Sequence, residues 1–153
     1  MASPLTLILP VIPGTNLATL SGTLGQSNTL LDAALTSIGT VHYARILLLD
    51  ASAANLQPSE KPTDSYVIAV ITEYDGSFTA YIGDFVAQVG AIFDALLAFV
   101  VDGQALIPVA NNVAAFGDFI ALNDASQHQP NLNLFQAYTA TVQEILANLP
   151  PSS

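Results

Sequence analysis

The stretch Val41-His42-Tyr43-Ala44-Arg45-Ile46-Leu47-Leu48-Leu49 decides the fold, because it predicts a strand that is apolar on both faces. Side chains alternate along a strand, so positions 42, 44, 46 and 48 point one way and positions 43, 45, 47 and 49 point the other way. Helices of the same chain can cover one face of such a sheet. The second apolar face then needs a partner, and the stretch therefore predicts an oligomer as well as a sheet.

Two more strands and two amphipathic helices are expected around this stretch. Residues 5–11 and 66–74 read as strands, and Pro13-Gly14 closes the first of them. Residues 16–38 and 78–101 carry apolar side chains at helical spacing, and Gly22, Gly25 and Ser27-Asn28 predict a break in the first helix. Asn16 or Thr15, Gly39 and Ser77 are the expected caps. Residues 110–122 and 141–149 predict shorter helices, and residues 132–138 predict a fourth strand.

The resulting order of elements is β-α-β-β-α-β plus extra helices. It predicts an α+β domain of the ferredoxin-like type, with an antiparallel sheet that carries both long helices on one face and extra C-terminal helices. A chain of 153 residues has the length of one domain. We expect one domain over residues 1–153, with an ordered core at about 5–149 and a frayed tail at 150–153.

The composition supports an oligomer and excludes several classes of partner. Charged residues make up 9% of the chain and hydrophobic residues 52%, whereas about 25% charged residues is usual in soluble domains. The shortage of charge indicates apolar surface that is covered by a second subunit, and we expect a homodimer. A net charge of −10 argues against nucleic acid and against anionic membrane surfaces.

The same composition bears on compartment and membrane. Residues 85–101 form the longest apolar run, but Gln88 and Asp94 interrupt it and it is too short for a membrane span. The residues Met1-Ala2-Ser3-Pro4-Leu5 lack the basic region of a secretory signal, so we expect a cytoplasmic protein. The absence of cysteine excludes disulfides and thiolate metal sites.

Three motifs carry a resemblance to a known superfamily. They are the opening Leu5-Thr6-Leu7-Ile8-Leu9-Pro10-Val11-Ile12-Pro13-Gly14, the stretch Ile38-Gly39-Thr40-Val41-His42-Tyr43-Ala44-Arg45, and the pair Glu73-Tyr74-Asp75-Gly76-Ser77-Phe78 and Tyr81-Ile82-Gly83-Asp84-Phe85. Together they resemble the dimeric α/β-barrel superfamily, which includes antibiotic-biosynthesis-monooxygenase-like proteins, and in particular poorly characterised bacterial proteins on that fold. The resemblance spans residues 5–101, and the last third of the chain follows it only in outline.

The resemblance implies a fold more than a reaction. In that superfamily two sheets pack face to face across a dimer, and each subunit keeps a pocket between its sheet and its helices. Its members include cofactor-free oxygenases, haem-using enzymes, cyclases, isomerases and proteins without known chemistry, so the fold does not assign a function. It supplies no catalytic set for this chain.

Arg45 and His42 are the first candidates for chemistry. Arg45 is the only arginine, and among apolar neighbours its guanidinium needs an acceptor. It can clamp a carboxylate or an enolate, or it can form a structural ion pair with Glu73, Asp75 or Asp84. His42 can act as a general base, because an imidazole titrates near neutrality, or it can be a hydrogen-bonded core or interface residue. The two side chains share a site only if a bulge intervenes.

Asp75 and the aromatic residues complete the set of candidate site residues. Asp75-Gly76-Ser77 reads as a turn that caps the next helix, and Asp75 can also pair with Arg45 or His42 at a pocket rim. Four tyrosines and one phenylalanine are candidates to line an apolar cavity and orient a substrate. They are Tyr43, Tyr74, Tyr81, Tyr138 and Phe85. His128 lies in a polar loop and is expected to be exposed.

No metal or cofactor motif is present in the sequence. The two histidines, His42 and His128, do not have the spacing of a metal site, and no motif supports a haem ligand, although His42 is the residue to test. There is no phosphate loop and no nucleophile elbow. Two hypotheses remain: an enzyme without a tightly bound organic cofactor that acts on an apolar, aromatic or polyketide-like small molecule, of monooxygenase, cyclase or isomerase type, and a non-catalytic ligand-binding or assembly module.

Overall fold

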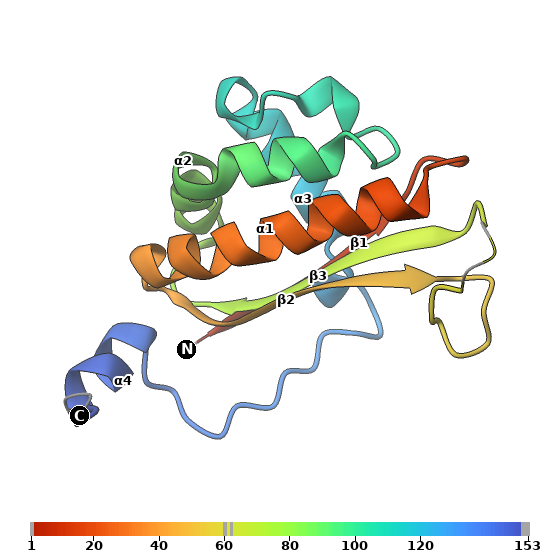
Figure 1. Ribbon diagram of the computed structural model, residues 1–153. Coiled ribbons are helices and arrows are strands. Elements are labelled where there is room, and N and C mark those ends of the chain that lie inside the picture. The colour runs from red at the N-terminus through yellow and green to blue at the C-terminus, as the bar shows by residue number, and fades with distance from the viewer. Residues whose placement is uncertain (1, 60, 62, 151–153) are drawn as a thin grey trace.

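A three-stranded antiparallel sheet with helices on one face forms the centre of the molecule (Figure 1). The computed structural model describes residues 2–59, 61 and 63–150. The strands β1 (Ser3–Pro10), β2 (Val41–Asp50) and β3 (Tyr66–Tyr74) lie in the order β1-β3-β2. Helices α1 (Leu17–Ile38), α2 (Phe78–Leu97) and α3 (Val113–Asn123) form the helical layer. The predicted α+β class and the antiparallel sheet are confirmed.

The register of the sheet separates a helix-covered face from an open face. Leu7, Val70 and Ile46 lie opposite one another and face the helices, and the neighbouring row on the same face is Leu9, Ile68 and Leu48. The alternate rows form the open face. These rows are Pro4–Glu73–Tyr43, Thr6–Ile71–Arg45, Ile8–Ala69–Leu47 and Pro10–Val67–Leu49. The open face is therefore mostly apolar, with one acid and one arginine near one end.

The helix-covered face supplies the core. The buried side of α2 carries Phe85, Val89 and Phe93, as its helical spacing predicts, while Asp84 and Gln88 are exposed. A chain of aromatic rings continues from the end of β3 through α2 to α3, with centroid separations of 4.0, 4.8, 5.3 and 5.3 Å. Its members in order are Tyr74, Tyr81, Phe85, Phe93 and Phe116. Ring pairs at these distances add specific attraction to the burial of apolar area.

Helix α1 is continuous, so the expected break at its glycines is wrong. Asn16 accepts a hydrogen bond from the backbone N–H of Thr19 at 3.0 Å, and Gly39 ends the helix with φ 65°. Glycine in a helix costs about 1 kcal/mol relative to alanine. Leu20, Leu24 and Leu31 are buried against the core, and their burial outweighs that cost.

The fourth strand expected at residues 132–138 is absent, and β3 lies between the only two other strands of the described chain. The outer edge of β1 is occupied by a different segment. Asp124 accepts the backbone N–H of Thr6 at 2.9 Å, and the Ser126 hydroxyl donates to the carbonyl of Pro4 at 3.1 Å. These bonds satisfy β1 groups that a fourth strand would pair with, so the following residues continue as an extended segment.

This extended segment, residues 129–141, is called the C-terminal arm below. It runs on the side of the sheet away from the main helices and leads to α4 (Val142–Asn148), which lies apart from the helical layer (Figure 1). Thr141 and Glu144 form a capping box at the start of α4. Phe135 of the C-terminal arm is 89% exposed. Of the tail expected at residues 150–153, residues 151–153 lie outside the described part of the chain.

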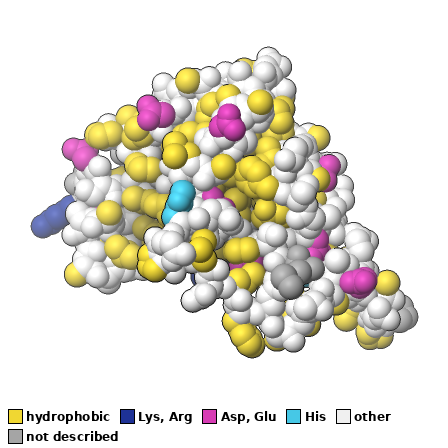
Figure 2. Space-filling model, turned by 180° about the vertical axis from the view of Figure 1, so that it is seen from behind, with side chains coloured by type: hydrophobic (Ala, Val, Ile, Leu, Met, Phe, Trp, Pro, Cys, Tyr) yellow, Lys and Arg dark blue, Asp and Glu magenta, His cyan; other side chains and the backbone are white. Residues whose placement is uncertain are grey.

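The surface agrees with the low charge of the sequence. On the face seen in Figure 2, hydrophobic side chains are numerous and acidic side chains lie singly among them. Helix α2 alone has the length and apolar composition that could cross a membrane, among the helices described, but ten of its residues are buried inside this fold. It is the core helix of the domain, and the described chain is consistent with the expectation of no membrane span.

Candidate functional site

A β-bulge sets the position of His42 at the start of β2. Val41 pairs with Tyr74 and Tyr43 pairs with Glu73, so His42 is an extra residue between two consecutive pairs. A bulge re-aims the side chains beside it, and bulges are frequent next to active sites. The bulge therefore takes the side chain of His42 out of the ordinary alternation of the strand.

His42 forms an ion pair or hydrogen bond with Asp75. Its Nε2 lies 3.1 Å from Oδ1 of Asp75, and the two side chains are only 5% and 10% exposed. Asp75 follows β3 directly and is fixed by its own N–H, which donates to the carbonyl of Thr40 at 2.8 Å. Gly76, at φ 94°, and Ser77, which caps α2, complete the turn that the sequence predicts.

Asp75 also ties the start of α4 to the sheet. Its Oδ2 accepts the backbone N–H of Val142 at 2.7 Å. Burial raises the pKa of Asp75, but the hydrogen bonds from Val142 and His42 and the charge of His42 outweigh it and hold the pKa below its usual value. An ionised Asp75 is an acceptor only, so Nε2 of His42 carries the proton of that bond and Nδ1 is left for another partner.

Glu73 is a second carboxyl group beside His42, and it has a different environment. It faces the open side of the sheet, where its Oε2 is buried and has no hydrogen-bond partner among the described residues. Burial raises the pKa of Glu73, and the charge of His42 opposes that shift without cancelling it. The two acids near His42 therefore differ: hydrogen bonds and the charge of His42 lower the pKa of Asp75, whereas burial raises the pKa of Glu73.

Tyr43 and Tyr138 bring the sheet and the C-terminal arm together. Their hydroxyl oxygens are 3.4 Å apart, and the ring of Tyr138 lies 6.2 Å from that of His42. The hydrogen bond to Tyr43 raises the pKa of the Tyr138 hydroxyl. The arm is also held at Gln136, whose amide donates to the carbonyl of Ala2. Gln143 of α4 donates to the carbonyl of Gly39 at 2.7 Å.

Two hollows meet at these residues. The first, called the arm cleft, has a volume of about 280 Å³ and lies between the sheet and the C-terminal arm. It is lined by His42, Tyr43, Glu73, Phe135, Gln136 and Tyr138 together with Ala2, Leu134, Ala137 and Ala140. The second has a volume of about 510 Å³, lies between α1, β2 and α4, and shares His42, Tyr43 and Tyr138 with the arm cleft. An apolar hollow with a few converging polar groups is the usual form of a small-molecule site.

A larger hollow of about 1050 Å³ lies between the start of β1, the start of α2 and the C-terminal arm. Its one carboxylate, Asp124, is buried and already accepts hydrogen bonds from Thr6 and Ser126. The bonds from Thr6 and Ser126 all end on Oδ1 of Asp124. No histidine is among the described residues that line this hollow, so it lacks an acid–base pair like that of His42 and Asp75.

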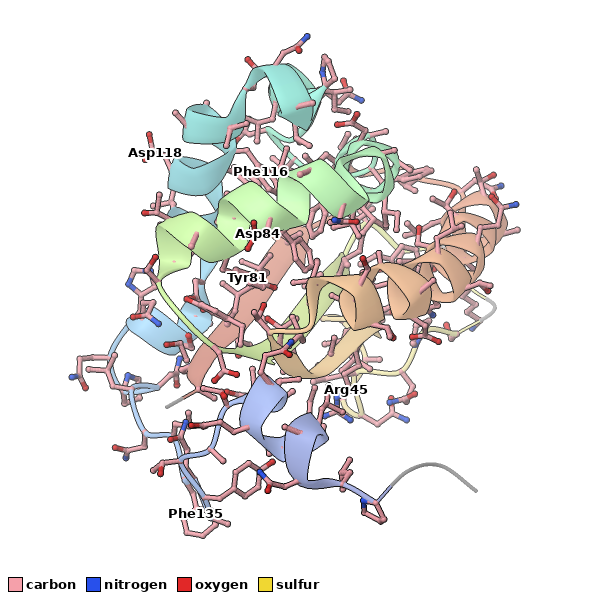
Figure 3. The ribbon with its side chains drawn as sticks, turned by 90° about the vertical axis from the view of Figure 1, so that its left-hand side faces the viewer. Arg45, Tyr81, Asp84, Phe116, Asp118 and Phe135 are labelled. Atoms are coloured by element: carbon pink, nitrogen blue, oxygen red, sulfur yellow. The ribbon has the colours of Figure 1, made fainter. Side chains whose placement is uncertain are left out.

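Arg45 does not join His42. The residue is exposed, and Figure 3 shows its side chain on the side of the sheet away from α1 and α2. It makes no ion pair with Glu73, Asp75 or Asp84 in the described structure. The expected burial of Arg45 is wrong, because the face of β2 that carries it is the open face. It lines a separate hollow, which shares Tyr43 and Glu73 with the arm cleft.

Three of the aromatic candidates lie in the core instead of the clefts at His42. Tyr74, Tyr81 and Phe85 are buried in the aromatic chain, and Figure 3 shows Tyr81 between α2 and the sheet. The Tyr81 hydroxyl lies 3.1 Å from that of Thr72, and burial raises its pKa. Packing in the core is enough to explain why these three residues are aromatic. Tyr74 also lines the hollow of about 1050 Å³. Tyr43 and Tyr138 remain at the candidate site.

No group of three or more histidines and acids that could hold a metal ion is found in the described part of the chain. His128 is exposed, as expected, and lies outside both clefts at His42. Sequence reasoning treated Glu73 only as a structural partner of Arg45 and so missed it as a site residue. Its spacing of two from Asp75, beside the bulge, is the signal that points to it.

Comparison of the chain with protein-family models, with curated proteins and with solved structures gives no match. The site is therefore interpreted from its own geometry.

Proposed function

We propose that the chain is a small-molecule enzyme without a tightly bound organic cofactor, of monooxygenase, cyclase or isomerase type, which acts on an apolar, aromatic or polyketide-like substrate. The observation that carries the proposal is the His42–Asp75 pair at 3.1 Å, placed by a bulge at the wall of two apolar hollows. A histidine oriented by a carboxylate is a common arrangement for moving a proton.

Each group has a role in this proposal. His42 moves the proton through Nδ1, while Asp75 fixes the imidazole and balances its charge. Tyr43 and Tyr138 stack against an aromatic substrate and direct their hydroxyls to it. Arg45 lies next to the arm cleft and contributes positive potential there, at the rim instead of inside.

The fold and assembly are part of the same proposal. The chain is a ferredoxin-like member of the dimeric α/β-barrel superfamily, in which β1 lacks a fourth strand as neighbour. Two copies pack their open faces together, since isolated apolar faces of this size are rare on monomers. The proposal also places the protein in the cytoplasm.

Titration of the two imidazoles by NMR, with and without 2-naphthol, tests the function. 2-Naphthol is an apolar aromatic probe that carries one hydroxyl group. His42 signals should respond to both pH and the probe, and His128, which is exposed outside these clefts, is the internal control and should ignore the probe. The variant His42→Ala should remain folded and lose the probe-dependent shifts of Tyr43 and Tyr138.

The alternative is a non-catalytic ligand-binding or assembly module of the same fold. The observation that favours it is that the polar groups of Tyr81 and Asp124 already form hydrogen bonds within the core. If His42 ignores 2-naphthol and keeps one protonation state from pH 5 to pH 8, the enzyme proposal fails and the module is the better description.

A further inference from the structure

Glu73 is the polar group of the arm cleft that the fold does not explain. It occupies the central strand in the row Pro4–Glu73–Tyr43, immediately beside the bulge that carries His42. No described side chain or backbone group bonds to its Oε2, although that atom is buried. A buried acceptor without a partner costs free energy. Such a group in a hollow is available to a hydrogen-bond donor that enters the cleft, whether water or a ligand.

The arm cleft restricts what that molecule can be. Its volume of about 280 Å³ is near the lower limit of small-molecule pockets. Its walls are aromatic and aliphatic side chains, mainly from the C-terminal arm, and its titratable groups are His42, Glu73, Tyr43 and Tyr138. The cleft fits a small, uncharged, aromatic molecule with one polar atom.

We infer that Glu73 and His42 form a base and acid pair that moves a proton at a carbon next to a carbonyl, so that the substrate class is a small enolisable aromatic ketone. This inference rests on the proposed function and deepens it: among the reaction types above, it selects isomerisation. It requires no cofactor, metal or oxidant.

The proposed step balances within the site. Oε2 of Glu73 takes the proton from the carbon next to the carbonyl, and the electron pair of that C–H bond forms a C=C bond. The carbonyl π pair moves to oxygen, which takes a proton from Nδ1 of the imidazolium of His42. The step leaves an enol, a neutral His42 and a protonated Glu73. The reverse transfers, at the same carbon or at a conjugated one, return both protons and close the cycle.

The two carboxyl groups fit these separate roles. Asp75 is held ionised and compensates the positive imidazolium, while desolvated Glu73 binds a proton more readily than an ordinary carboxylate. Pairs of titratable groups whose environments push their pKa values apart are typical of acid–base sites. The groups that face Glu73 are His42, Arg45 and Tyr43 of β2 and Tyr138 of the C-terminal arm, with Asp75 behind His42.

A first experiment measures the titration of Glu73, and its dependence on His42, without any substrate. The chain has only three glutamates, Glu60, Glu73 and Glu144, so ¹³C-carboxyl glutamate labelling gives three signals, which single Glu→Gln variants assign. Glu73 should titrate above Glu144, whose bonds to Thr141 lower its pKa. In His42→Phe the Glu73 midpoint should move up, because the charge that lowers it is gone. A Glu73 midpoint that ignores His42→Phe contradicts the pairing.

A second experiment measures proton transfer with 2-tetralone, an enolisable aromatic ketone, in D₂O. Proton NMR follows the exchange of deuterium into the two carbons next to the carbonyl. The wild type should exceed buffer that contains equal imidazole and acetate, and Glu73→Gln should lower the catalysed rate by about 10²–10⁴-fold while 2-naphthol, an aromatic analogue of the enol, still binds. Asp118→Asn, an exposed change on α3 (Figure 3), is the control and should leave the rate unchanged.

The outcomes separate this inference from the function on which it rests. Exchange by Glu73→Gln at the wild-type rate overturns the role of Glu73, and so does a wild type that exchanges no faster than buffer while His42 responds to 2-naphthol. In both cases the proposed function stands. If His42 also ignores 2-naphthol, both fail. Should Glu73→Gln not fold, Glu73→Asp keeps the charge and shortens the reach, and it should exchange at an intermediate rate.

Discussion

The two faces of the sheet share three strands but differ in what covers them. On the helix-covered face Leu7 is fully buried, whereas on the open face the adjacent Ile8 is 39% exposed. Burying a leucine or isoleucine side chain stabilises the folded state by about 1.5–3 kcal/mol. The covered face therefore stabilises the monomer. The open face, with the bulge and the C-terminal arm at its end, retains apolar surface and the buried Oε2 of Glu73, which has no hydrogen-bond partner among the described residues.

The largest expected effect is a difference in stability between substitutions of Leu7 and Ile8, which are neighbours on β1. Leu7→Ala leaves a cavity in the core and should lower the free energy of unfolding by about 2–5 kcal/mol. Ile8→Ala should cost less than about 1 kcal/mol in the monomer, because Ile8 has few neighbours to lose. Urea denaturation of both variants at low protein concentration measures the difference. Equal losses would show that the open face is as well packed as the core.

The next effect tests what covers the open face. Leu47→Glu places a charge in its central row and should weaken the proposed dimer at least about a hundredfold, or roughly 3 kcal/mol, because a buried charge has no partner there. Sedimentation at micromolar concentration should show a dimer for the wild type and a monomer for the variant. Leu122→Glu, on exposed α3, is the matched control and should remain dimeric. A monomeric wild type would refute the dimer.

The bond from Asp75 to the start of α4 should give an intermediate effect. Asp75→Asn removes the charge that holds His42 and Val142, and hydrogen bonds to charged groups contribute about 1.5–3 kcal/mol. We expect a loss of about 1–2 kcal/mol and faster proteolysis of the C-terminal arm, with the core intact. Asp84→Asn, an exposed change on α2, is the control.

The pH dependence of this bond follows from the lowered pKa of Asp75. Because the folded pKa lies below the unfolded value of about 3.9, the stabilisation is fully present above the unfolded value. It is lost as the pH falls through the folded pKa. Comparing unfolding of the wild type with that of Asp75→Asn from pH 6 to pH 2 should show the difference shrinking in acid. A difference that grows in acid would contradict the assignment.

The sequence predicts the covered half of the molecule better than the open half. Leu5, Leu7 and Leu9, the spacing of Phe85, Val89 and Phe93, and the caps Asn16 and Ser77 each act locally, so their pattern is visible in the chain. The prediction of a fourth strand at residues 132–138 is wrong because a contact between segments far apart in the sequence occupies the edge of β1. Asp124 and Ser126 bond to the edge of β1, about 120 residues away in sequence, and no local pattern shows that.

The candidate site divides in the same way. The turn at Asp75-Gly76-Ser77 was predictable from residue types, and so was the interest of His42. The bulge that brings His42 to Asp75 depends on the register between β2 and β3, and the cleft at Glu73 depends on the C-terminal arm, which forms its other wall. Alternation alone would have placed His42 on the helix-covered face.

The smallest effect concerns Arg45, and it tests the open face most directly. A lone arginine in an apolar strand suggests a buried charge, whose removal from an ion pair would cost about 3–5 kcal/mol. Arg45 is instead exposed and makes no ion pair among the described residues. Arg45→Ala should therefore change the stability of the monomer by no more than about 0.5 kcal/mol. Urea denaturation at several protein concentrations measures this. A loss that grows with concentration would place Arg45 inside the dimer interface, and a large loss at every concentration would mean that the guanidinium has an acceptor within its own chain.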